Sequence, residues 1–409
     1  MALSTWEQAA ESLAHLHLSR TSQYCDVGMG LLGQVLAEDV LAESSNPRFA
    51  MSAMDGWAIH AKDINAGVGG LTIAGTVLAG MAAPNLKAGT TCAIMTGAPV
   101  PSQTAAVIPV EDVREQEGKL FWDIPLRAGQ HIRAQGEDFK HNQPILPQGT
   151  RLLAQHLVLL RTAGVRQVKV LAPVAINLIQ TGNELVEIDK NLAAGSVYES
   201  TRDCMVSALH QLDKCLITSQ QVQDTKEALQ AAMQQALDAG VQLILTTGGV
   251  SKGVADHVPD VAKALGATIV LHRLAIKPAK PLLIARFPNG AILVGLPGNP
   301  ISQLVALQAV VFPLLMGKPM LQGMNTIKAT LTNPCAGKIG FRTFIRGRTS
   351  VGEDGRLLVQ PLTGNESHRV ANLATCNAWL HVVGDHAAGS LIEVSPLLST
   401  EWRLPPCQA

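Results

Sequence analysis

The segment from Val241 to Asp256 holds the residues best suited to bind an anionic ligand. An apolar run, Val241–Leu245, has the length and branched composition of a buried strand. It leads into a loop of small residues, Thr246–Gly253, whose glycines let backbone N–H groups approach an anion without a side chain in the way. Asp256 then precedes a predicted helix at 257–265. Because ligands of open α/β sheets collect at the carboxyl ends of strands, we expect a phosphate-bearing ligand at this loop.

Two further loops of the same region carry acidic residues. Glu184 either binds a cation or positions a water molecule, or it stands in an ordinary tight turn with Asn183 in a left-handed conformation, and the residues alone leave both open. Asp224 precedes a predicted helix, and its spacing to Glu227 matches a capping box. Taken alone, this spacing predicts that Asp224 caps the helix and does not bind a ligand.

A fourth loop carries two lysines, Lys277 and Lys280, each followed by a proline. Because proline lacks an N–H donor and fixes φ, we expect this segment to be extended, with both ammonium groups converging on one anion. Solvated surface lysines are the alternative, which the rigid proline frame disfavours. Asn299 is predicted to cap the next helix, with Pro300 in its first turn, which places a positive helix end beside the lysines. Together the four loops supply carboxylates for a divalent cation and cations for an oxyanion.

Other motifs give weaker signals. Ser52–Gly56 and Met95–Pro99 each present a polar residue followed by glycine, which a plain turn explains about as well as the tip of an active site. Glycines at 28, 30 and 33 match a dinucleotide-binding pattern, but no apolar strand leads into them and no βαβ unit surrounds them. We interpret that match as a coincidence. The sequence has no P-loop, zinc-hydrolase or serine-esterase motif.

Composition limits the classes of protein to which the chain can belong. With 409 residues, 47% of them hydrophobic, we expect two to four well-buried domains. Thirty-two basic and 32 acidic residues cancel, so neither nucleic acid nor an acidic membrane surface is an expected partner. The first residues have no basic region ahead of an apolar core, and the most apolar predicted helix is short and holds a proline, so we expect neither a signal peptide nor a membrane span. Seven scattered cysteines without a C-x-x-C pair suit reduced thiols in a cytoplasm.

The pattern of elements predicts a multidomain protein of the α/β class. Residues 46–138 hold short strand-like runs between glycines and prolines, which predicts a β-rich inserted domain within a discontinuous N-terminal domain at 1–45 and 139–171. Residues 172–320 alternate strand and helix and so predict a mostly parallel α/β domain, and 321–409 predict a small C-terminal β domain. The predicted strands of the α/β domain are Val174–Ile179, Val241–Leu245, Thr268–Leu271 and Ile292–Leu296, and its predicted helices are Thr201–Leu212, Thr225–Ala239, His257–Leu265 and Ile301–Leu315.

A set of short motifs runs through nearly the whole chain. It comprises S-A-M-D-G at 52–56, M-T-G-A-P-V-P at 95–101, G-E-D at 136–138, T-G-N-E-L at 181–185, G-G-V-S-x-G-x-x-D at 248–256, K-P-x-K-P at 277–281 and G-L-P-G-N-P at 295–300. In order and spacing the set resembles the molybdopterin molybdenumtransferase family, MoeA, which includes the gephyrin E domain. The resemblance implies an elongated homodimer of four-part subunits, in which the α/β domain has the molybdenum-cofactor-biosynthesis fold. It also implies that the active site forms between that domain and the partner's β-rich insert.

The same resemblance implies the reaction and its partners. The enzyme would take adenylylated molybdopterin and molybdate as substrates, insert the metal into the dithiolene and release AMP, with Mg²⁺ as cofactor. A molybdopterin adenylyltransferase and molybdoenzyme maturation proteins are the further partners it implies, in the cytoplasm.

Carried onto this sequence, the resemblance implies a site in three parts. Lys277, Lys280 and Ser251 would bind molybdate, a tetrahedral dianion, by charge-assisted hydrogen bonds, completed by Ser367 and one of two arginines. Three carboxylates would hold Mg²⁺ against the pyrophosphate, which makes Asp224 a site residue as well as a cap. Asp55 and Thr96 would reach across the dimer to the nucleotide or pterin. The implied catalytic residues are Asp55, Thr96, Glu184, Asp224 and Asp256, the last three as metal ligands, and the implied substrate-binding residues are Gly248, Gly249, Ser251, Lys277, Lys280, Pro281, Pro297, Pro300, Arg342, Arg346 and Ser367.

Three positions depart from the family's pattern. Asn183 stands where aspartate is common, which removes one potential metal ligand; Ala279 stands where glycine is frequent; and Thr247 replaces a usual serine but keeps the hydroxyl. The other site residues remain, so we predict an active enzyme. One alternative is a nucleotide amidohydrolase or pyrophosphatase that shares the α/β domain, as competence-damage proteins do, although S-A-M-D-G and K-P-x-K-P disfavour it. The other is a pterin- or partner-binding scaffold without catalysis, for which Asn183 is the only support.

Overall fold

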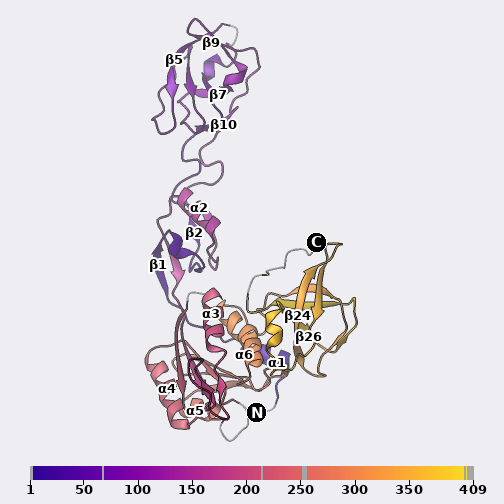
Figure 1. The fold of residues 1–409 in the computed structure, drawn as a ribbon. Coiled ribbons are helices and arrows are strands. Elements are labelled where there is room, and N and C mark those ends of the chain that lie inside the picture. The colour runs from indigo at the N-terminus through magenta and orange to yellow at the C-terminus, as the bar shows by residue number, and fades with distance from the viewer. Residues whose placement is uncertain (1–2, 67–68, 213–214, 251–255, 400–401, 403–409) are drawn as a thin grey trace. The chain divides into compact units, whose positions relative to one another are not determined.

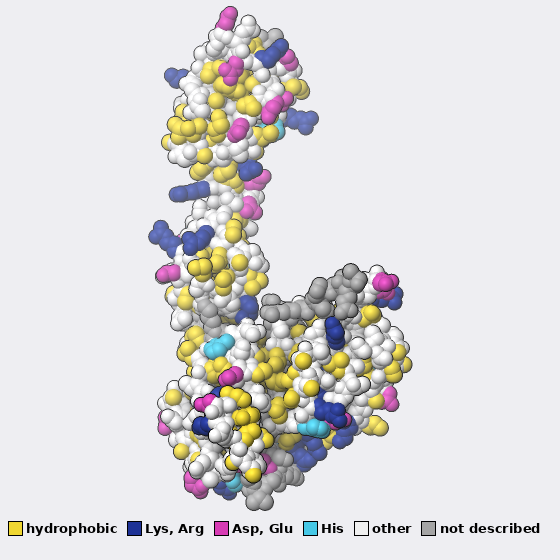
Figure 2. Space-filling view, in the orientation of Figure 1, with side chains coloured by type: hydrophobic (Ala, Val, Ile, Leu, Met, Phe, Trp, Pro, Cys, Tyr) yellow, Lys and Arg dark blue, Asp and Glu magenta, His cyan; other side chains and the backbone are white. Residues whose placement is uncertain are grey.

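The computed structural model describes residues 3–66, 69–212, 215–250, 256–399 and 402, and the chain divides into two compact units. The large unit comprises residues 1–21 and 172–409, and the small unit comprises residues 22–171. On the face drawn in Figure 2, basic and acidic side chains are interspersed on each unit, as expected from equal numbers of the two. Within the described residues no helix is long and apolar enough to cross a membrane.

The large unit is built on a six-stranded, mostly parallel sheet, which confirms the predicted α/β class (Figure 1). Its strands, in spatial order, are β16 (Leu216–Val222), β13 (Ala175–Thr181), β17 (Leu243–Thr247), β21 (Ile292–Leu296), β20 (Leu283–Arg286) and β18 (Thr268–His272). The first four are parallel, and β20 runs antiparallel to both of its neighbours. The carboxyl ends of β16, β13, β17 and β21 therefore lie at one edge of the sheet.

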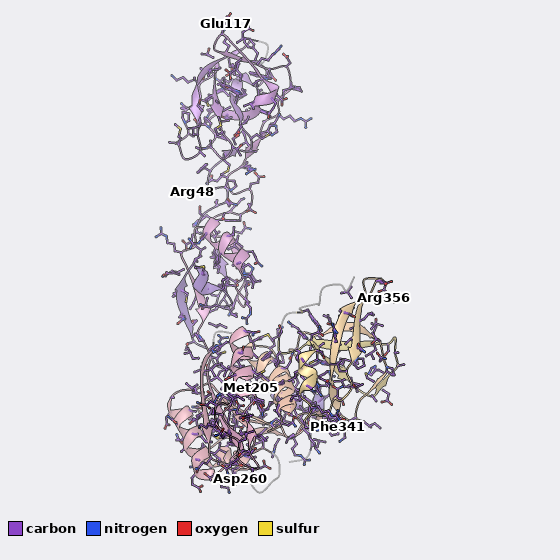
Figure 3. All side chains as sticks on the ribbon, viewed as in Figure 1. Arg48, Glu117, Met205, Asp260, Phe341 and Arg356 are labelled. Atoms are coloured by element: carbon purple, nitrogen blue, oxygen red, sulfur yellow. The ribbon has the colours of Figure 1, made fainter. Side chains whose placement is uncertain are left out.

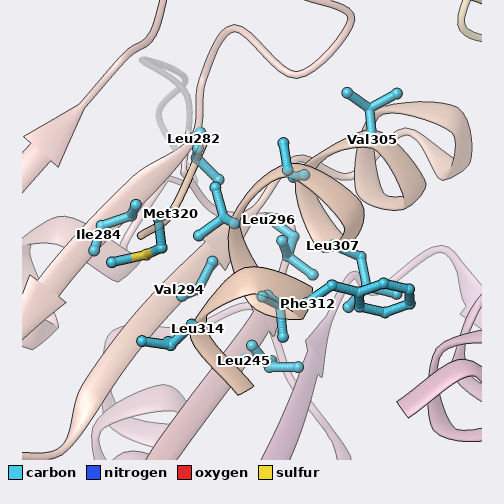
Figure 4. Packing of buried hydrophobic residues seen from close by; sticks show 14 of the residues in the cluster. Leu245, Leu282, Ile284, Val294, Leu296, Val305, Leu307, Phe312, Leu314 and Met320 are labelled. Carbon is cyan, nitrogen blue, oxygen red and sulfur yellow. The ribbon is translucent and has the colours of Figure 1, made fainter. Parts of the chain in front are cut away.

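Helices cover both faces of this sheet. They are α3 (Arg202–Leu212), α4 (Lys226–Asp238), α5 (Val258–Ala264), α6 (Pro300–Ala306), the π-helix η4 (Leu307–Val311) and α7 (Phe312–Leu315). Alternate residues of the central strand divide between two cores: Leu243 and Leu245 pack with the α3, α6 and α7 layer, and Ile244 packs with α4 and α5. Figure 4 shows Leu245 among the buried side chains on the α6–α7 side of the sheet.

Sequence patterns missed two strands of the sheet and predicted one continuous helix where the structure has three consecutive helical segments. The edge strand β16 is largely polar and mostly exposed, so it lacks the apolar run of a buried strand, and β20 has only four residues. The helix predicted over Ile301–Leu315 contains a π-helical segment instead. Because Pro313 has no N–H, the carbonyl of Ala309 has no α-helical donor, and it accepts the N–H of Leu321 at 2.8 Å.

The first helix belongs to the large unit, which differs from the predicted N-terminal domain at 1–45. In α1 (Trp6–Leu13), Thr5 and Gln8 form a capping box, and one face buries Trp6 and Leu13 in the main core beside the sheet. The N–H of Ser4 also donates to the carbonyl of Arg273 at 3.1 Å. An amphipathic pattern shows that a helix buries one face, but it does not identify the domain against which that face packs.

The C-terminal residues form a closed β-barrel. The strands are β22 (Ile327–Leu331), β24 (Arg342–Val351), β25 (Leu357–Pro361), β26 (Ala378–Val382) and β28 (Leu391–Pro396), and the pairing of β26 with β24 closes the ring. A sixth strand, β19 (Ile276–Lys277), extends β24 in parallel, with Lys277 in register with Thr343. This pairing joins the lysine-bearing loop of the α/β domain to the barrel.

The small unit contains a second six-stranded sheet. Its strands, in spatial order, are β7 (Thr104–Pro109), β4 (Gly56–His60), β6 (Thr90–Ile94), β5 (Leu71–Val77), β9 (Lys119–Phe121) and β8 (Arg114–Gln116). A separate core gathers around α2 (Ala154–Thr162) and the antiparallel pair β1 (Ser22–Asp26) and β12 (Gln167–Leu171). Gly28 precedes a three-residue 3₁₀-helix, Met29–Leu31, Gly30 lies within it and Gly33 follows it. The neighbouring strands β1 and β12 pair antiparallel, so these glycines do not belong to a βαβ unit, in agreement with the interpretation of the dinucleotide pattern as a coincidence.

Replacing Gly56 with alanine is expected to destabilise the small unit by roughly 2–4 kcal/mol, because the new Cβ would lie 2.0 Å from the carbonyl oxygen of Ile108. Gly28→Ala is the matched control, since it places a Cβ with nothing within 4 Å on extended backbone. Urea unfolding of both variants measures the difference, and equal stabilities would contradict the close approach of β4 and β7.

Candidate functional site

A polar hollow of about 200 Å³ lies at the carboxyl edge of the parallel strands. We call it the acidic pocket, because Glu184, Glu199 and Asp224 line it, together with Gly248, Gly249 and Pro300. Glu184 follows β13, Asp224 follows β16, and the two glycines follow β17. The parallel sheet thus brings together three loops that span 65 positions of the sequence, from Glu184 to Gly249, as expected for loops that follow parallel strands.

The three predicted carboxylates interact electrostatically. Burial is the main cause that raises the pKa of Asp224, and the charges of Glu184 and Asp256 raise it further, against the opposing charge of His257. A cation beside these groups would relieve their mutual repulsion. Within the described residues no three acidic, histidine or cysteine side chains close on one point as a metal cage. The donors nevertheless suit Mg²⁺, which one or two carboxylates commonly hold together with water and substrate phosphate.

Asp224 is not the cap of α4, although the sequence predicted that it would be. Thr225 caps the helix, and its hydroxyl accepts the N–H of Ala228 at 3.3 Å. The N–H of Asp224 donates to Oδ1 of Asn183 at 3.2 Å, so the asparagine fixes the backbone that carries the carboxylate. Asp224 lines the acidic pocket and does not cap α4, although its spacing to Glu227 suggested that it would.

The glycine loop needs glycine at its start. Gly248 has a φ of +84° and Gly249 a φ of +66°, and a Cβ on Gly248 would lie 3.1 Å from two atoms of Thr181. The N–H of Gly248 donates to the carbonyl of Leu296 at 3.0 Å, so this group is engaged within the fold and does not face an anion as predicted. Ser251 lies outside the described residues.

One acidic residue of this pocket was missed from the sequence. Glu199 precedes α3 and accepts the N–H groups of Thr201 at 2.7 Å and Arg202 at 2.9 Å. Burial raises the pKa of Glu199, but these hydrogen bonds outweigh it and hold the pKa below its usual range. Arg202 also forms a two-point ion pair with Glu187, at 2.6 and 2.8 Å. An acidic residue two positions ahead of a threonine and a helix start is the sequence signal that could have identified Glu199.

A second hollow of about 610 Å³ lies between the sheet edge and the barrel. We call it the lysine pocket, because Lys277, Lys280 and Lys338 line it, with Ser302, Ser367 and Pro281. Phe341, which directly precedes β24 and is labelled in Figure 3, also lines this pocket. Nζ of Lys338 lies 4.2 Å from the centroid of its ring. Both predicted lysines are exposed and face the same hollow, as an oxyanion site requires.

The backbone of the lysine loop is only partly extended. Lys277 lies in β19, as predicted, but Ala279 has a φ of +85°, and the N–H of Leu274 donates to the carbonyl of Lys280 at 3.0 Å. The segment therefore turns after Lys277, and the turn brings Lys280 back to the same pocket. Alternating prolines exclude a helix but do not by themselves fix an extended chain.

Neither predicted arginine lines the lysine pocket. Arg346 is 1% exposed, and its guanidinium donates to the carbonyls of Gly364, Glu366 and Arg369, so it fixes the loop that presents Ser367. Burial lowers the pKa of Arg346. Arg342 lies 4.6 Å over the ring of Trp6 and 3.8 Å from a carboxylate oxygen of Glu393. Both guanidinium groups are therefore engaged within the fold, and neither faces the pocket where an oxyanion was expected to bind.

The acidic residues and the lysines do not line a single hollow, which differs from the one shared cleft that the sequence suggested. The first turn of α6 lies beside both pockets: Pro300 and Gln303 line the acidic pocket, and Ser302 lines the lysine pocket. Asn299 caps this helix, as predicted, by accepting the N–H of Ile301 at 3.2 Å. Pro297 is buried directly after β21 and lines neither hollow.

In the small unit, the two predicted residues are joined to each other. Oδ1 of Asp55 accepts the backbone N–H of Thr96 at 2.7 Å and its hydroxyl at 2.8 Å. These bonds hold the pKa of Asp55 below its usual range. Both residues are exposed, so the motifs at 52–56 and 95–99 form one polar tip on this unit.

Comparison with known proteins covers nearly the whole chain. Residues 4–164 match the MoeA N-terminal region (domain I and II), residues 177–317 match a probable molybdopterin binding domain, and residues 328–397 match the MoeA C-terminal region (domain IV). The chain is 34% identical over 377 residues to a molybdopterin molybdenumtransferase of Synechococcus elongatus, covering 89% of this chain and 92% of that one. It is 31% identical over 372 residues to the one of Haemophilus influenzae, covering 89% and 91%. A solved structure of the molybdopterin biosynthesis MoeA protein from Pyrococcus horikosii aligns with a TM-score of 0.84 and 26% identity, over 98% of this chain and 100% of that chain.

The chain belongs to the molybdopterin molybdenumtransferase family. Two of its departures from the family's pattern now have a structural meaning. The φ of +85° at Ala279 is a conformation that favours glycine, which explains why glycine is frequent at this position of the family. Asn183 uses its side-chain oxygen to accept the N–H of Asp224, a bond that an aspartate could also make, so the asparagine keeps the geometry and removes one negative charge.

Replacing Arg346 with methionine is expected to lower the free energy of unfolding by roughly 3–5 kcal/mol, because the carbonyls of Gly364, Glu366 and Arg369 lose the donors that this buried side chain supplies. Arg342→Met is the control, with an expected loss of no more than about 1–2 kcal/mol, because its ion pair is partly exposed. Denaturant unfolding measures both variants. A larger loss in the Arg342 variant would contradict the assignment of Arg346 to the loop.

Proposed function

We propose that this chain inserts molybdate into adenylylated molybdopterin and releases AMP, and so forms molybdenum cofactor. The observation that carries the proposal is the pair of pockets on either side of the first turn of α6, one lined by carboxylates and the other by lysines. The family match supports it, because it extends over the regions outside the α/β domain. A nucleotide hydrolase that shares only that domain is not favoured for the same reason.

In this proposal the acidic pocket holds the diphosphate of the adenylylated pterin. Glu184, Asp224 and Asp256 would hold Mg²⁺, which supplies Lewis-acid charge to the diphosphate when bound. The raised pKa of Asp224 and its neighbouring charges support a cation at this place. Asn183 positions Asp224 through its backbone N–H. One water molecule is added across the phosphoanhydride P–O bond as it breaks, so that AMP leaves with one phosphate and the pterin keeps the other.

The lysine pocket holds the second substrate. Molybdate carries two negative charges, and Lys277 and Lys280 would bind its oxygens by charge-assisted hydrogen bonds. The hydroxyl of Ser367 completes the site on the barrel side, where Arg346 fixes its loop. The first turn of α6 would then separate the oxyanion from the diphosphate by a short distance, so that metal insertion and AMP release take place side by side.

We also propose a cytoplasmic homodimer in which Asp55 and Thr96 of a second copy complete the acidic pocket. The resemblance of the two tip motifs to the family supports this, as does the exposed carboxylate of Asp55. A molybdopterin adenylyltransferase would supply the adenylylated substrate, and molybdoenzyme maturation proteins would accept the product.

The reaction itself is tested with purified protein, adenylylated molybdopterin and Mg²⁺, with and without molybdate. We expect AMP release that depends on molybdate, together with metallated pterin, measured by chromatography. AMP release that is equal in both samples would point to a hydrolase. Binding of the pterin without any turnover would point to a scaffold, and either result would overturn the proposal.

The shared site is tested by mixing two inactive variants, Asp55→Asn and Glu184→Gln. If the two residues act in one site but come from different copies, exchange of subunits restores about a quarter of wild-type activity, because half of the dimers carry one intact site. A mixture of Glu184→Gln with Asp224→Asn is the control, and it stays inactive because both residues line the same pocket of one chain. A first mixture that also stays inactive after proven exchange would contradict the shared site.

A further inference from the structure

Two buried glutamines lie deep in the acidic pocket. Gln180 is the sixth residue of β13 and is 0% exposed, and Gln303 lies in the first turn of α6 and is 3% exposed. Both line the pocket beside the carboxylates, from opposite elements of the fold. The register of the sheet sets Gln180 against Thr247, directly before the glycine loop. Burying two amide side chains lowers the stability of the fold unless their polar atoms are hydrogen-bonded.

Three of the four amide atoms have no partner among the described residues. Nε2 of Gln303 donates to the carbonyl of Gly298 at 3.1 Å, but its Oε1 is buried and unpaired. Gln180 faces the carboxylate of Glu199 and helps to lower the pKa of that group, yet neither atom of its amide reaches hydrogen-bond geometry with a described residue. A buried polar group without a partner destabilises the folded chain, so a ligand in this pocket would gain affinity by pairing these atoms.

A third glutamine shows how the fold treats an amide with a structural role. Gln308 lies five residues beyond Gln303 in the same helical run and is also 3% exposed. Its Nε2 donates to the carbonyl of Pro396, and its Oε1 accepts the N–H of Leu398 at 2.8 Å. Both ends of this amide are therefore bonded within the chain, whereas Gln303 is bonded at one end only and Gln180 at neither.

We propose that Gln180 and Gln303 are specificity residues that bind the edge of the substrate's heteroaromatic ring, an inference that rests on the function proposed above. The unpaired atoms amount to two acceptors and one donor. The complementary edge carries two N–H donors beside one acceptor. The amino-oxo-pyrimidine ring of a pterin offers this pattern in full, with its amino group, ring N–H and carbonyl. Adenine offers one donor and one acceptor on such an edge, with its amino group and a neighbouring ring nitrogen, and glutamine binds adenine in this two-point manner elsewhere.

The test compares Gln180→Leu and Gln303→Leu with the wild-type protein in calorimetric titrations with two probes, AMP and pterin. We expect each variant to weaken one of the two probes roughly tenfold, the ratio that corresponds to about 1.4 kcal/mol for a lost hydrogen bond. The probe that weakens identifies the ring. The thermal midpoint of Gln180→Leu should stay unchanged or rise, because this substitution removes two unpaired buried atoms. The midpoint of Gln303→Leu should fall slightly, because the bond to the carbonyl of Gly298 is lost with the amide. Gln303→Met, which is unbranched like glutamine, serves if the leucine variant does not fold.

Gln308→Leu is the matched control. Its thermal midpoint should fall, because Pro396 and Leu398 lose their partners, and its affinity for both probes should equal that of the wild type. The inference is overturned if the wild type binds neither probe, if both pocket variants bind both probes as the wild type does, or if their midpoints fall with no change in affinity. Turnover of adenylylated molybdopterin separates the two proposals. If the wild type shows no molybdate-dependent AMP release, the proposed function fails. If the wild type is active and both glutamine variants have the same KM as the wild type, only this inference fails.

Discussion

The structure depends on one constraint, the parallel alignment of four neighbouring strands. Parallel strands end at the same edge of a sheet, so the loops after β13, β16, β17 and β21 must meet, although long stretches of chain separate them. Each crossover returns through a helix whose apolar face seals one side of the sheet. The hydrophobic core therefore sets the position of the polar loops, and these loops need little structure of their own.

The first turn of α6 organises the site because it borders both pockets. Asn299 caps the turn, Gln303 enters the acidic pocket, and Ser302 faces the lysine pocket. The barrel completes the second pocket through the pairing of β19 with β24, which sets Lys277 against Thr343. One short helical segment thus has a carboxylate-lined pocket on one side, suited to a cation, and a lysine-lined pocket on the other, suited to an anion.

Patterns of apolar runs predicted the central strands, because burial determines them, and Asn299 followed by Pro300 predicted the cap of α6. The place of Asp224 beside Glu184 followed from the family resemblance, since spacing alone predicted that Asp224 caps a helix. Features that depend on tertiary contacts were not predictable. The polar edge strand β16 has no apolar signature, and the burial of Arg346 depends on the path of a distant loop. The deep glutamines also escaped, because glutamine in a sequence carries no sign of whether it is bonded or buried. Family resemblance supplied the roles that spacing alone left open.

The central claim is that the carboxylates and the lysines serve two separate substrates. Calorimetric titration of molybdate into the Lys280→Met and Asp224→Asn variants tests it most directly. The account predicts that the lysine variant binds molybdate roughly tenfold more weakly than the wild type, since one charge-assisted hydrogen bond is lost, and that the aspartate variant binds it unchanged. Weaker binding in the aspartate variant alone, or equal weakening in both, would contradict the division of the site into two pockets.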